Sequence, residues 1–194
     1  MTRKPLAAKA EPTPYRFTVK EWNRLGEAGL FDEHDRVELL DGEIIIMSPI
    51  GSRHAAAVYN LTDLFGELNR RRYLVGVGNP VEADNHSEPL PDFMLLPRSQ
   101  KTAKRHPFTR DTHLIVEIAD SSLRHDRGRK LQKYARTGVP EYWIVNLKQD
   151  VIEVYRSPKG EEFLDQTIAK AGETISPQAF PDVPVAVNDI IPPR

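Results

Sequence analysis

The sequence predicts a mixed α/β fold, in which a partly parallel β-sheet is flanked by helices. Short apolar runs of strand length alternate with two longer segments whose apolar residues recur at helical spacing. A hairpin signal precedes this core and further β-forming runs follow it. A sheet with a helix on each face buries the apolar side of every element, and its hairpins make it only partly parallel.

Length and composition set the frame for this fold. The 194 residues suit one domain, expected over residues 15–194, with a flexible N-terminal tail over residues 1–14. The absence of cysteine excludes disulfides, zinc–thiolate sites and cysteine nucleophiles. No apolar run approaches the roughly 18 residues of a membrane span, and the N-terminus does not read as a secretory signal. A cytoplasmic location is therefore expected.

The segments before the core predict a helix, a hairpin and a longer helix. Thr18 can cap a helix whose Glu21 completes a capping box, and Gly29 helps to end it. Asp41-Gly42 joins two apolar runs at residues 37–40 and 43–47, which predicts a β-hairpin. A second helix is expected over residues 52–71, with Ser52 as its N-cap.

Apolar runs bounded by turn residues predict the strands of the sheet. They cover residues 73–77, 93–96, 113–118, 141–146, 150–155 and 163–168. Asp120-Ser121-Ser122 begins a helix that runs to about residue 137, and Gly138 is its expected C′ residue. The strand at residues 150–155 is expected to pair with that at residues 141–146 as a hairpin, and residues 163–168 add a further strand.

Two carboxylates placed in apolar strands are the first candidate functional residues. Asp92 follows Pro91 at the edge of one strand, and Glu117 lies inside the next. A buried carboxylate is costly unless it is paired or holds a metal ion, and Mg²⁺ prefers a few carboxylate oxygens with several waters. We expect the two to converge in a strand-end cleft as the metal site of a phosphodiesterase. The alternatives are a turn residue for Asp92 and an ion pair with an arginine for Glu117.

A catalytic site of this kind also needs a cation. The residue two beyond Glu117 would share its face of the strand, but it is Ala119. The following helix offers Lys130 instead, four residues from Asp126, although these two could also form a surface ion pair. We expect Lys130 to point at the carboxylates with its stem buried, and Lys133 to be more exposed.

At this point several short motifs together resemble the Uma-two family, which is assigned to the PD-(D/E)XK nuclease superfamily. The resemblance covers roughly residues 15–192. Its motifs are Pro91-Asp92 and residues 117–122, 126–131, 134–136 and 138–145, with residues 37–44 and His54 upstream.

The resemblance implies a restriction-endonuclease-like core and hydrolysis of DNA with Mg²⁺, or alternatively Mn²⁺. Asp92 and Glu117 match the two acids that hold the metal, and Lys130 matches a lysine that has migrated from position 119. Glu38 is the candidate for the upstream acid of related resolvase-type nucleases. It could equally be a hairpin residue paired with Arg36 or Arg53, and His54 a capping or core histidine.

The expected partners are DNA and a second copy of the chain. Basic runs at residues 101–106 and 124–136 are expected to border the cleft, although each could also be a solvated face. The resemblance points to two-fold dimers, and a sheet edge near the C-terminus is expected to expose apolar side chains. These are Tyr142, Trp143, Val151, Val154 and Tyr155.

Two other readings of the function stay open. A catalytically inactive nuclease-like module could bind nucleic acid or a protein partner, and Ala119 favours this alternative. A hydrolase acting on a small phosphodiester is the other. The sequence does not decide between DNA and RNA.

Overall fold

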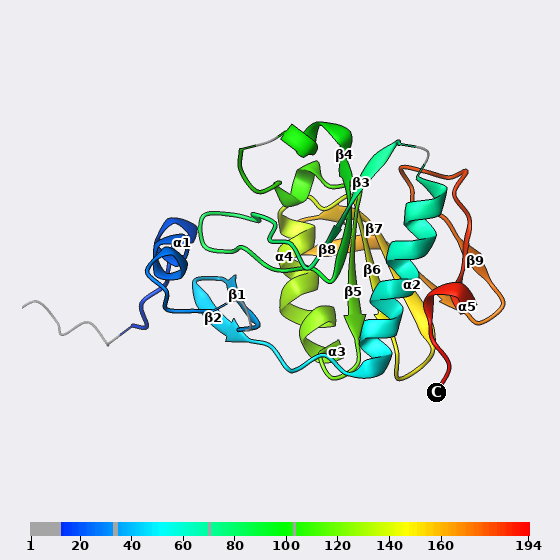
Figure 1. Ribbon diagram of the computed structural model, residues 1–194, viewed down its shortest axis with the longest axis horizontal. Coiled ribbons are helices and arrows are strands. Elements are labelled where there is room, and N and C mark those ends of the chain that lie inside the picture. Colours follow the sequence, from blue (N-terminus) through cyan, green and yellow to red (C-terminus); the bar gives the residue numbers. More distant parts are fainter. Residues whose placement is uncertain (1–12, 33–34, 70, 103) are drawn as a thin grey trace, which may run out of the picture.

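The fold is built on one six-stranded sheet, seen in the computed structural model of Figure 1, which describes residues 13–32, 35–69, 71–102 and 104–194. Its strands lie in the order β3-β4-β5-β6-β7-β8. β5 and β6 are parallel and the other neighbours are antiparallel. The strands are β3 (Tyr73–Val77), β4 (Phe93–Pro97), β5 (Leu114–Ala119), β6 (Glu141–Asn146), β7 (Val151–Lys159) and β8 (Glu162–Lys170).

Helices cover both faces of this sheet, as the sequence predicted. On one face α2 (Ser52–Leu68) packs Leu61 and Phe65 into a core that includes Trp143. On the other face lie α3 (Leu123–His125), the π-helical turn η3 (Asp126–Lys130) and α4 (Leu131–Arg136), and Tyr134 packs there against Tyr142. The predicted mixed α/β fold is thereby confirmed.

A small N-terminal unit stands beside the α4 side of the sheet (Figure 1). It contains α1 (Val19–Glu27), which begins with the predicted Thr18–Glu21 capping box, and the antiparallel hairpin of β1 (Val37–Leu40) and β2 (Glu43–Ile46). Asp41 and Gly42 have φ of 52° and 75°, the left-handed values of a type I′ turn. The predicted hairpin is confirmed, and it forms a separate two-stranded sheet.

Some helix boundaries differ from the sequence prediction. α2 has Gly51 as its N-cap, so Ser52 is its first residue and makes no capping bond. The single helix expected over residues 120–137 contains a π-helical turn, and Gly138 follows it with φ of 77°. The basic segment after β4 contains two 3₁₀ turns, η1 (Arg98–Thr102) and η2 (Thr109–Asp111). Most of the expected N-terminal tail, residues 1–12, lies outside the described residues.

The C-terminal residues overturn one prediction. Tyr142 and Trp143 are fully buried, Val154 and Tyr155 nearly so, and Val151 is half-buried. The reason is that β8 runs alongside the whole of β7 and covers it, which makes β8 the edge strand. The chain then ends with β9 (Thr174–Ile175), β10 (Val185–Ala186) and α5 (Val187–Ile190). Within the described part of the chain, no helix has the length and apolar character needed to cross a membrane.

Candidate active site

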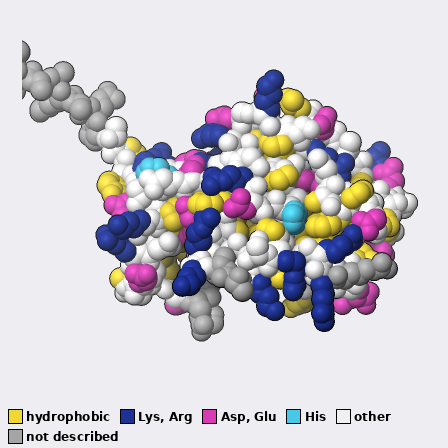
Figure 2. Space-filling view, turned by 90° about the horizontal axis from the view of Figure 1, so that it is seen from above, with side chains coloured by type: hydrophobic (Ala, Val, Ile, Leu, Met, Phe, Trp, Pro, Cys, Tyr) yellow, Lys and Arg dark blue, Asp and Glu magenta, His cyan; other side chains and the backbone are white. Residues whose placement is uncertain are grey.

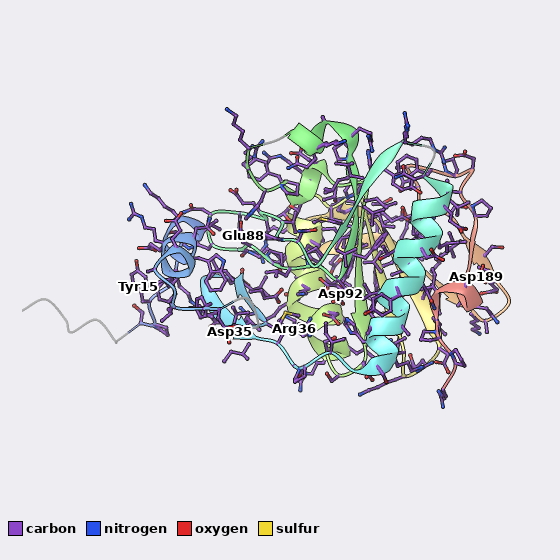
Figure 3. The ribbon with its side chains drawn as sticks, in the orientation of Figure 1. Tyr15, Asp35, Arg36, Glu88, Asp92 and Asp189 are labelled. Carbon is purple, nitrogen blue, oxygen red and sulfur yellow. The ribbon has the colours of Figure 1, made fainter. Side chains whose placement is uncertain are left out.

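A pocket of about 270 Å³ lies where β4 begins and β5 ends, between α2, the β1–β2 hairpin and the start of α3. Figure 3 shows Asp92 and Arg36 close together at this place. The pocket gathers acidic and histidine side chains from distant parts of the sequence. These are Glu38, His54, Asp92, Glu117, Asp120, His125 and Asp126. Both sequence-predicted acids, Asp92 and Glu117, therefore face one cavity.

Asp92 is held by two elements at once. Its Oδ2 accepts a hydrogen bond of 2.8 Å from the backbone N–H of Ile118, the residue after Glu117. Its Oδ1 accepts from His54 Nε2 of α2 at 3.0 Å, and Arg36 Nη2 lies 3.9 Å away. Asp92 is 8% exposed. The antiparallel pairing of β4 with β5 brings it beside Glu117, and α2 supplies the histidine.

Glu117 is almost fully buried and is paired with a lysine and not with an arginine. Its Oε1 accepts from Lys130 Nζ at 2.9 Å and from the Tyr134 hydroxyl at 2.8 Å. Burial raises the pKa of Glu117 well above its ordinary value. Lys130 opposes this shift, while the charges of Asp92, Asp126 and Glu38 add to it. Glu117 thus has more negative charge around it than its lysine offsets.

Lys130 is completely buried between two carboxylates. Its Nζ lies 2.9 Å from Glu117 and 3.0 Å from Glu38. Burial would lower the pKa of Lys130, but Glu117 and Glu38 raise it above its ordinary value. The side chain is therefore a fixed positive charge at neutral pH. It sits at the end of the π-helical turn η3, and such turns are frequent at functional sites.

Glu38 comes from the hairpin and is fully buried. Besides Lys130, its carboxylate accepts from the backbone N–H of Leu90 at 3.1 Å and from His125 Nε2 at 3.4 Å. Burial would raise the pKa of Glu38, but Lys130 and these two donors lower it to about 2. The alternative pairing with Arg36 or Arg53 does not occur, since Arg53 pairs with Asp150. The hairpin thus contributes one acid, Glu38, to the pocket.

Sequence reasoning missed the place of Asp126. It is 2% exposed, lines the pocket, and accepts from Ser122 Oγ at 2.5 Å. Burial raises its pKa. The alternative of a surface ion pair with Lys130 does not apply, because both side chains are buried. The signal available in the sequence was its spacing of four residues before Lys130, directly after two serines that begin a helix.

The expectation that Lys133 is exposed is wrong. Lys133 is 3% exposed, and its Nζ lies 2.6 Å from both Asp41 and Asp84. The hairpin turn and the segment before β4 pack over α4 and supply these carboxylates. Lys133 links the N-terminal unit to α4 through ion pairs, whereas Lys130 contacts the acids of the pocket.

The described residues of the basic run 101–106 do not line the pocket either. β4 leads away from Asp92 toward this run, so it lies at the other end of the strand. Lys104, Arg105 and His106 border a separate hollow instead. Figure 2 views the molecule from that end and shows Lys and Arg side chains spread across it. In the run 124–136, Arg127 pairs with Glu153 and Arg129 with Glu43.

Two carboxylates are the donor set available for a divalent ion. Among the residues described, no group of three or more acidic, histidine or cysteine side chains is arranged to hold a metal. Mg²⁺ is commonly held by one or two carboxylates with waters completing its shell, so Asp92 and Glu117 suffice in number. The surplus negative charge at Glu117 also fits a cation beside it.

Comparisons with known proteins identify the family of this chain. A sequence model of the Uma2 family, described as "Putative restriction endonuclease", matches residues 20–188. The chain belongs to the Uma2 family. The resemblance found in the sequence is thereby confirmed, and the family is one of nucleases by its description. No curated protein matches the chain.

A solved structure shares the fold. A crystal structure from Anabaena variabilis ATCC 29413, described as a "putative nuclease belonging to DUF820", aligns with a TM-score of 0.72 at 14% identity. The alignment covers 90% of this Uma2 chain and 97% of that chain. The type IIG restriction endonuclease BpuSI aligns with a TM-score of 0.40 at 17% identity, over 64% of this chain and 14% of that one, too weakly to carry an argument.

Proposed function

We propose that this Uma2 protein is a metal-dependent endonuclease that hydrolyses phosphodiester bonds in DNA. The observation that carries the proposal is the placing of Asp92 and Glu117 in one pocket, with Lys130 buried against Glu117. In the reaction, water adds its oxygen to phosphorus, the P–O bond to one sugar breaks, and a proton goes to the departing oxygen.

Asp92 and Glu117 would hold Mg²⁺ or Mn²⁺. The unbalanced charge around Glu117 supports this, because a cation there would stabilise the ionised carboxylate. A bound divalent ion supplies polarisation of a phosphodiester oxygen and a lowered pKa for a bound water. The Ile118 N–H and His54 hold the Asp92 carboxylate in one orientation.

Lys130 acts as a fixed charge and not as a base. Its raised pKa keeps it protonated, so it cannot take a proton from water at neutral pH. From its buried place it orients Glu117 and offsets negative charge that develops on the phosphate. Glu38 serves the reaction through Lys130, because it holds the ammonium from the opposite side.

A catalytically inactive nuclease-like module that binds nucleic acid or a protein partner is the second candidate. Ala119 favours it, since the strand position that carries the superfamily's lysine here has a buried alanine. The engagement of Lys130 by both Glu38 and Glu117 also favours it, because no part of Lys130 lines the pocket.

We also propose a homodimer, with β8 as the contact strand. β8 is the sheet edge, and it exposes Leu164 by 62% and Ile168 by 52%. Its ends carry opposite charges, Glu162 and Lys170, so an antiparallel second copy would bring each end to its opposite. Edges of this kind are normally covered or paired.

The nuclease proposal is tested on circular DNA, which has no ends for an exonuclease. Purified full-length protein is incubated with circular single-stranded DNA and with plasmid, with Mg²⁺, with Mn²⁺ and with EDTA. We expect cleavage that needs the ion and that Asp92→Asn lowers by more than about a hundredfold, since a lost metal ligand costs at least as much as an outer partner. Asp189→Asn, an exposed acid on α5 labelled in Figure 3, is the control.

Three outcomes decide between the candidates. Cleavage by the wild type and by Asp189→Asn, but not by Asp92→Asn, supports the nuclease. Binding without cleavage under every condition supports the inactive module. Cleavage that survives Asp92→Asn contradicts the assignment of the site.

A further inference from the structure

Part of the pocket lining is apolar and comes from the end of β2 and the segment that follows it. Ile45, Ile46, Met47 and Pro49 line the pocket together with its acids. Ile46 exposes 83% of its surface and Ile50 exposes 49%, and neither packs into the two core clusters. An exposed apolar run that borders a polar cavity marks a binding surface more often than a chance feature of a monomer.

The pocket offers little positive charge to a nucleic-acid backbone. Arg36 is the sole Lys or Arg among the described residues that line it, and its Nη1 already donates to Ser48 O at 2.6 Å. Two cations of the neighbouring elements are paired inside the protein, Arg53 with Asp150 and Arg129 with Glu43, while Arg124 of α3 is exposed. A protein that binds duplex DNA tightly neutralises many phosphates at once. The cations of this pocket can neutralise about one or two phosphates.

The depth of the acids sets a further condition. Asp92 and Glu117 are 8% and 2% exposed, so a scissile phosphate must enter the pocket to reach them. In a stacked duplex the bases face the helix axis and are not free to cover an apolar wall. In an unpaired strand the backbone can bend inward, and each base presents an apolar face to the protein.

We infer that the pocket binds an unpaired segment of a nucleic-acid strand, whose bases pack on Ile46, Met47 and Pro49 while one phosphate reaches Asp92 and Glu117. This inference rests on the proposed nuclease function and specifies its substrate class. A frayed end, a flap, a bubble or a free single strand presents such a segment. A fully paired duplex does not.

The test compares paired and unpaired substrates of one sequence. The full-length chain is titrated, by fluorescence anisotropy in Ca²⁺, against a single strand of about thirty nucleotides, its duplex, and the duplex with a central unpaired bubble. Cleavage of the same substrates is followed in Mg²⁺ and Mn²⁺. We expect the strand and the bubble to bind at least about tenfold more tightly than the duplex, and cleavage to fall in unpaired nucleotides.

Ile46→Ser isolates the apolar wall, and Leu30→Ser is its matched control. Both side chains are large, aliphatic and mostly exposed, and Leu30, at 58% exposure, does not line the pocket. Ile46→Ser should weaken single-strand binding by about five- to tenfold, with duplex binding unchanged, because a base loses the apolar surface against which it is buried. Leu30→Ser should change neither.

Several results would overturn the inference. Equal or tighter binding and cleavage of the duplex would do so and would leave the proposed nuclease standing. Equal effects of Ile46→Ser and Leu30→Ser would remove the apolar wall from the argument. A change of oligomeric state in Ile46→Ser, without loss of strand binding, would make the wall an interface between copies. Failure to bind or cut any nucleic acid would sink both proposals.

Binding of a single strand of RNA with the same sequence tests whether the pocket prefers RNA or DNA. Equal binding of RNA and DNA supports recognition of unpaired bases without regard to the sugar. A preference for DNA supports this inference and the proposed function together. A preference for RNA supports binding of an unpaired strand but contradicts DNA as the substrate of the proposed function.

Discussion

At the residue scale, one buried ammonium is shared unequally by two carboxylates. Lys130 contacts Glu38 and Glu117 at similar distances, yet the pKa of Glu38 falls to about 2 while that of Glu117 rises. The difference follows from their other partners. Burial acts to raise the pKa of both, but Glu38 also receives the Leu90 N–H and His125, whereas Glu117 receives the Tyr134 hydroxyl and faces the charges of further acids. Glu117 is therefore the acid that still lacks positive charge.

Paired substitutions test the roles of the two buried lysines. Lys130→Met leaves Glu38 and Glu117 without their cation, so we expect a loss of about 3–5 kcal/mol in unfolding free energy and loss of cleavage. Lys133→Met removes contacts with Asp41 and Asp84, which are partly solvated, and should keep the cleavage rate per folded molecule. Urea unfolding and cleavage assays measure both.

Lys130→Arg keeps the charge and serves as the second variant in case Lys130→Met does not fold. We expect it to fold and to cleave slowly, because a planar guanidinium does not place its charge as an ammonium does. Loss of cleavage in Lys133→Met together with normal cleavage in Lys130→Met would refute the choice of lysine.

The lowered pKa of Glu38 predicts a dependence of stability on pH. Its carboxyl has an ordinary pKa of 4.5 and a folded pKa of about 2, so the unfolded chain takes up the proton first as the pH falls. Its contribution, about 3 kcal/mol, is present above pH 4.5 and is lost toward pH 2. The stability gap between wild type and Glu38→Gln should shrink in this window. Urea midpoints from pH 6 to 3 measure it, and a constant gap would contradict the assignment.

At the element scale, two turns with different demands position the site. The hairpin turn needs left-handed φ at Gly42, where an added Cβ would lie 2.7 Å from Arg16 Cβ. The π-helical turn contains Gly128, which has no atom within 4 Å of an added Cβ and no left-handed φ. The first glycine is required by its conformation, and the second is not.

These turns give opposite predictions for glycine-to-alanine changes. Gly128→Ala should raise the unfolding free energy by about 0.5–1 kcal/mol, because alanine favours the helical state, and cleavage should persist. Gly42→Ala should lower it by more than about 1 kcal/mol and reduce cleavage, since the hairpin that carries Glu38 is displaced. Thermal unfolding of both variants gives the answer. A stabilised Gly42→Ala would disprove the account of the hairpin.

At the whole-molecule scale, the proposed dimer depends on the edge strand β8. Sedimentation velocity at micromolar concentration should show a dimer for the wild type. Leu164→Lys combined with Ile168→Lys should give a monomer, because charges on an edge strand oppose pairing. Tyr59→Lys, an exposed aromatic on α2, is the control. A wild type that stays monomeric would overturn the proposal.

How well the sequence predicts a feature depends on how far apart in the sequence the contacting residues lie. The Thr18 capping box and the Asp41-Gly42 turn are local, and both form as predicted. Asp92 and Glu117 meet because β4 and β5, which follow each other in the sequence, are also neighbours in the sheet. The burial of Lys133 was missed, since its partners come from the hairpin and from the segment before β4. The position of Asp126 in the pocket was also missed, because it depends on a π-helical turn that the spacing of apolar residues does not reveal.

Whether Asp92 and Glu117 together bind a divalent ion is the central question, and isothermal titration with Mn²⁺ answers it most directly. Wild type and Asp189→Asn should bind the ion, because both keep the two carboxylates that face the pocket. Asp92→Asn and Glu117→Gln should each bind at least about tenfold more weakly. Unchanged Mn²⁺ affinity in both variants would contradict the account.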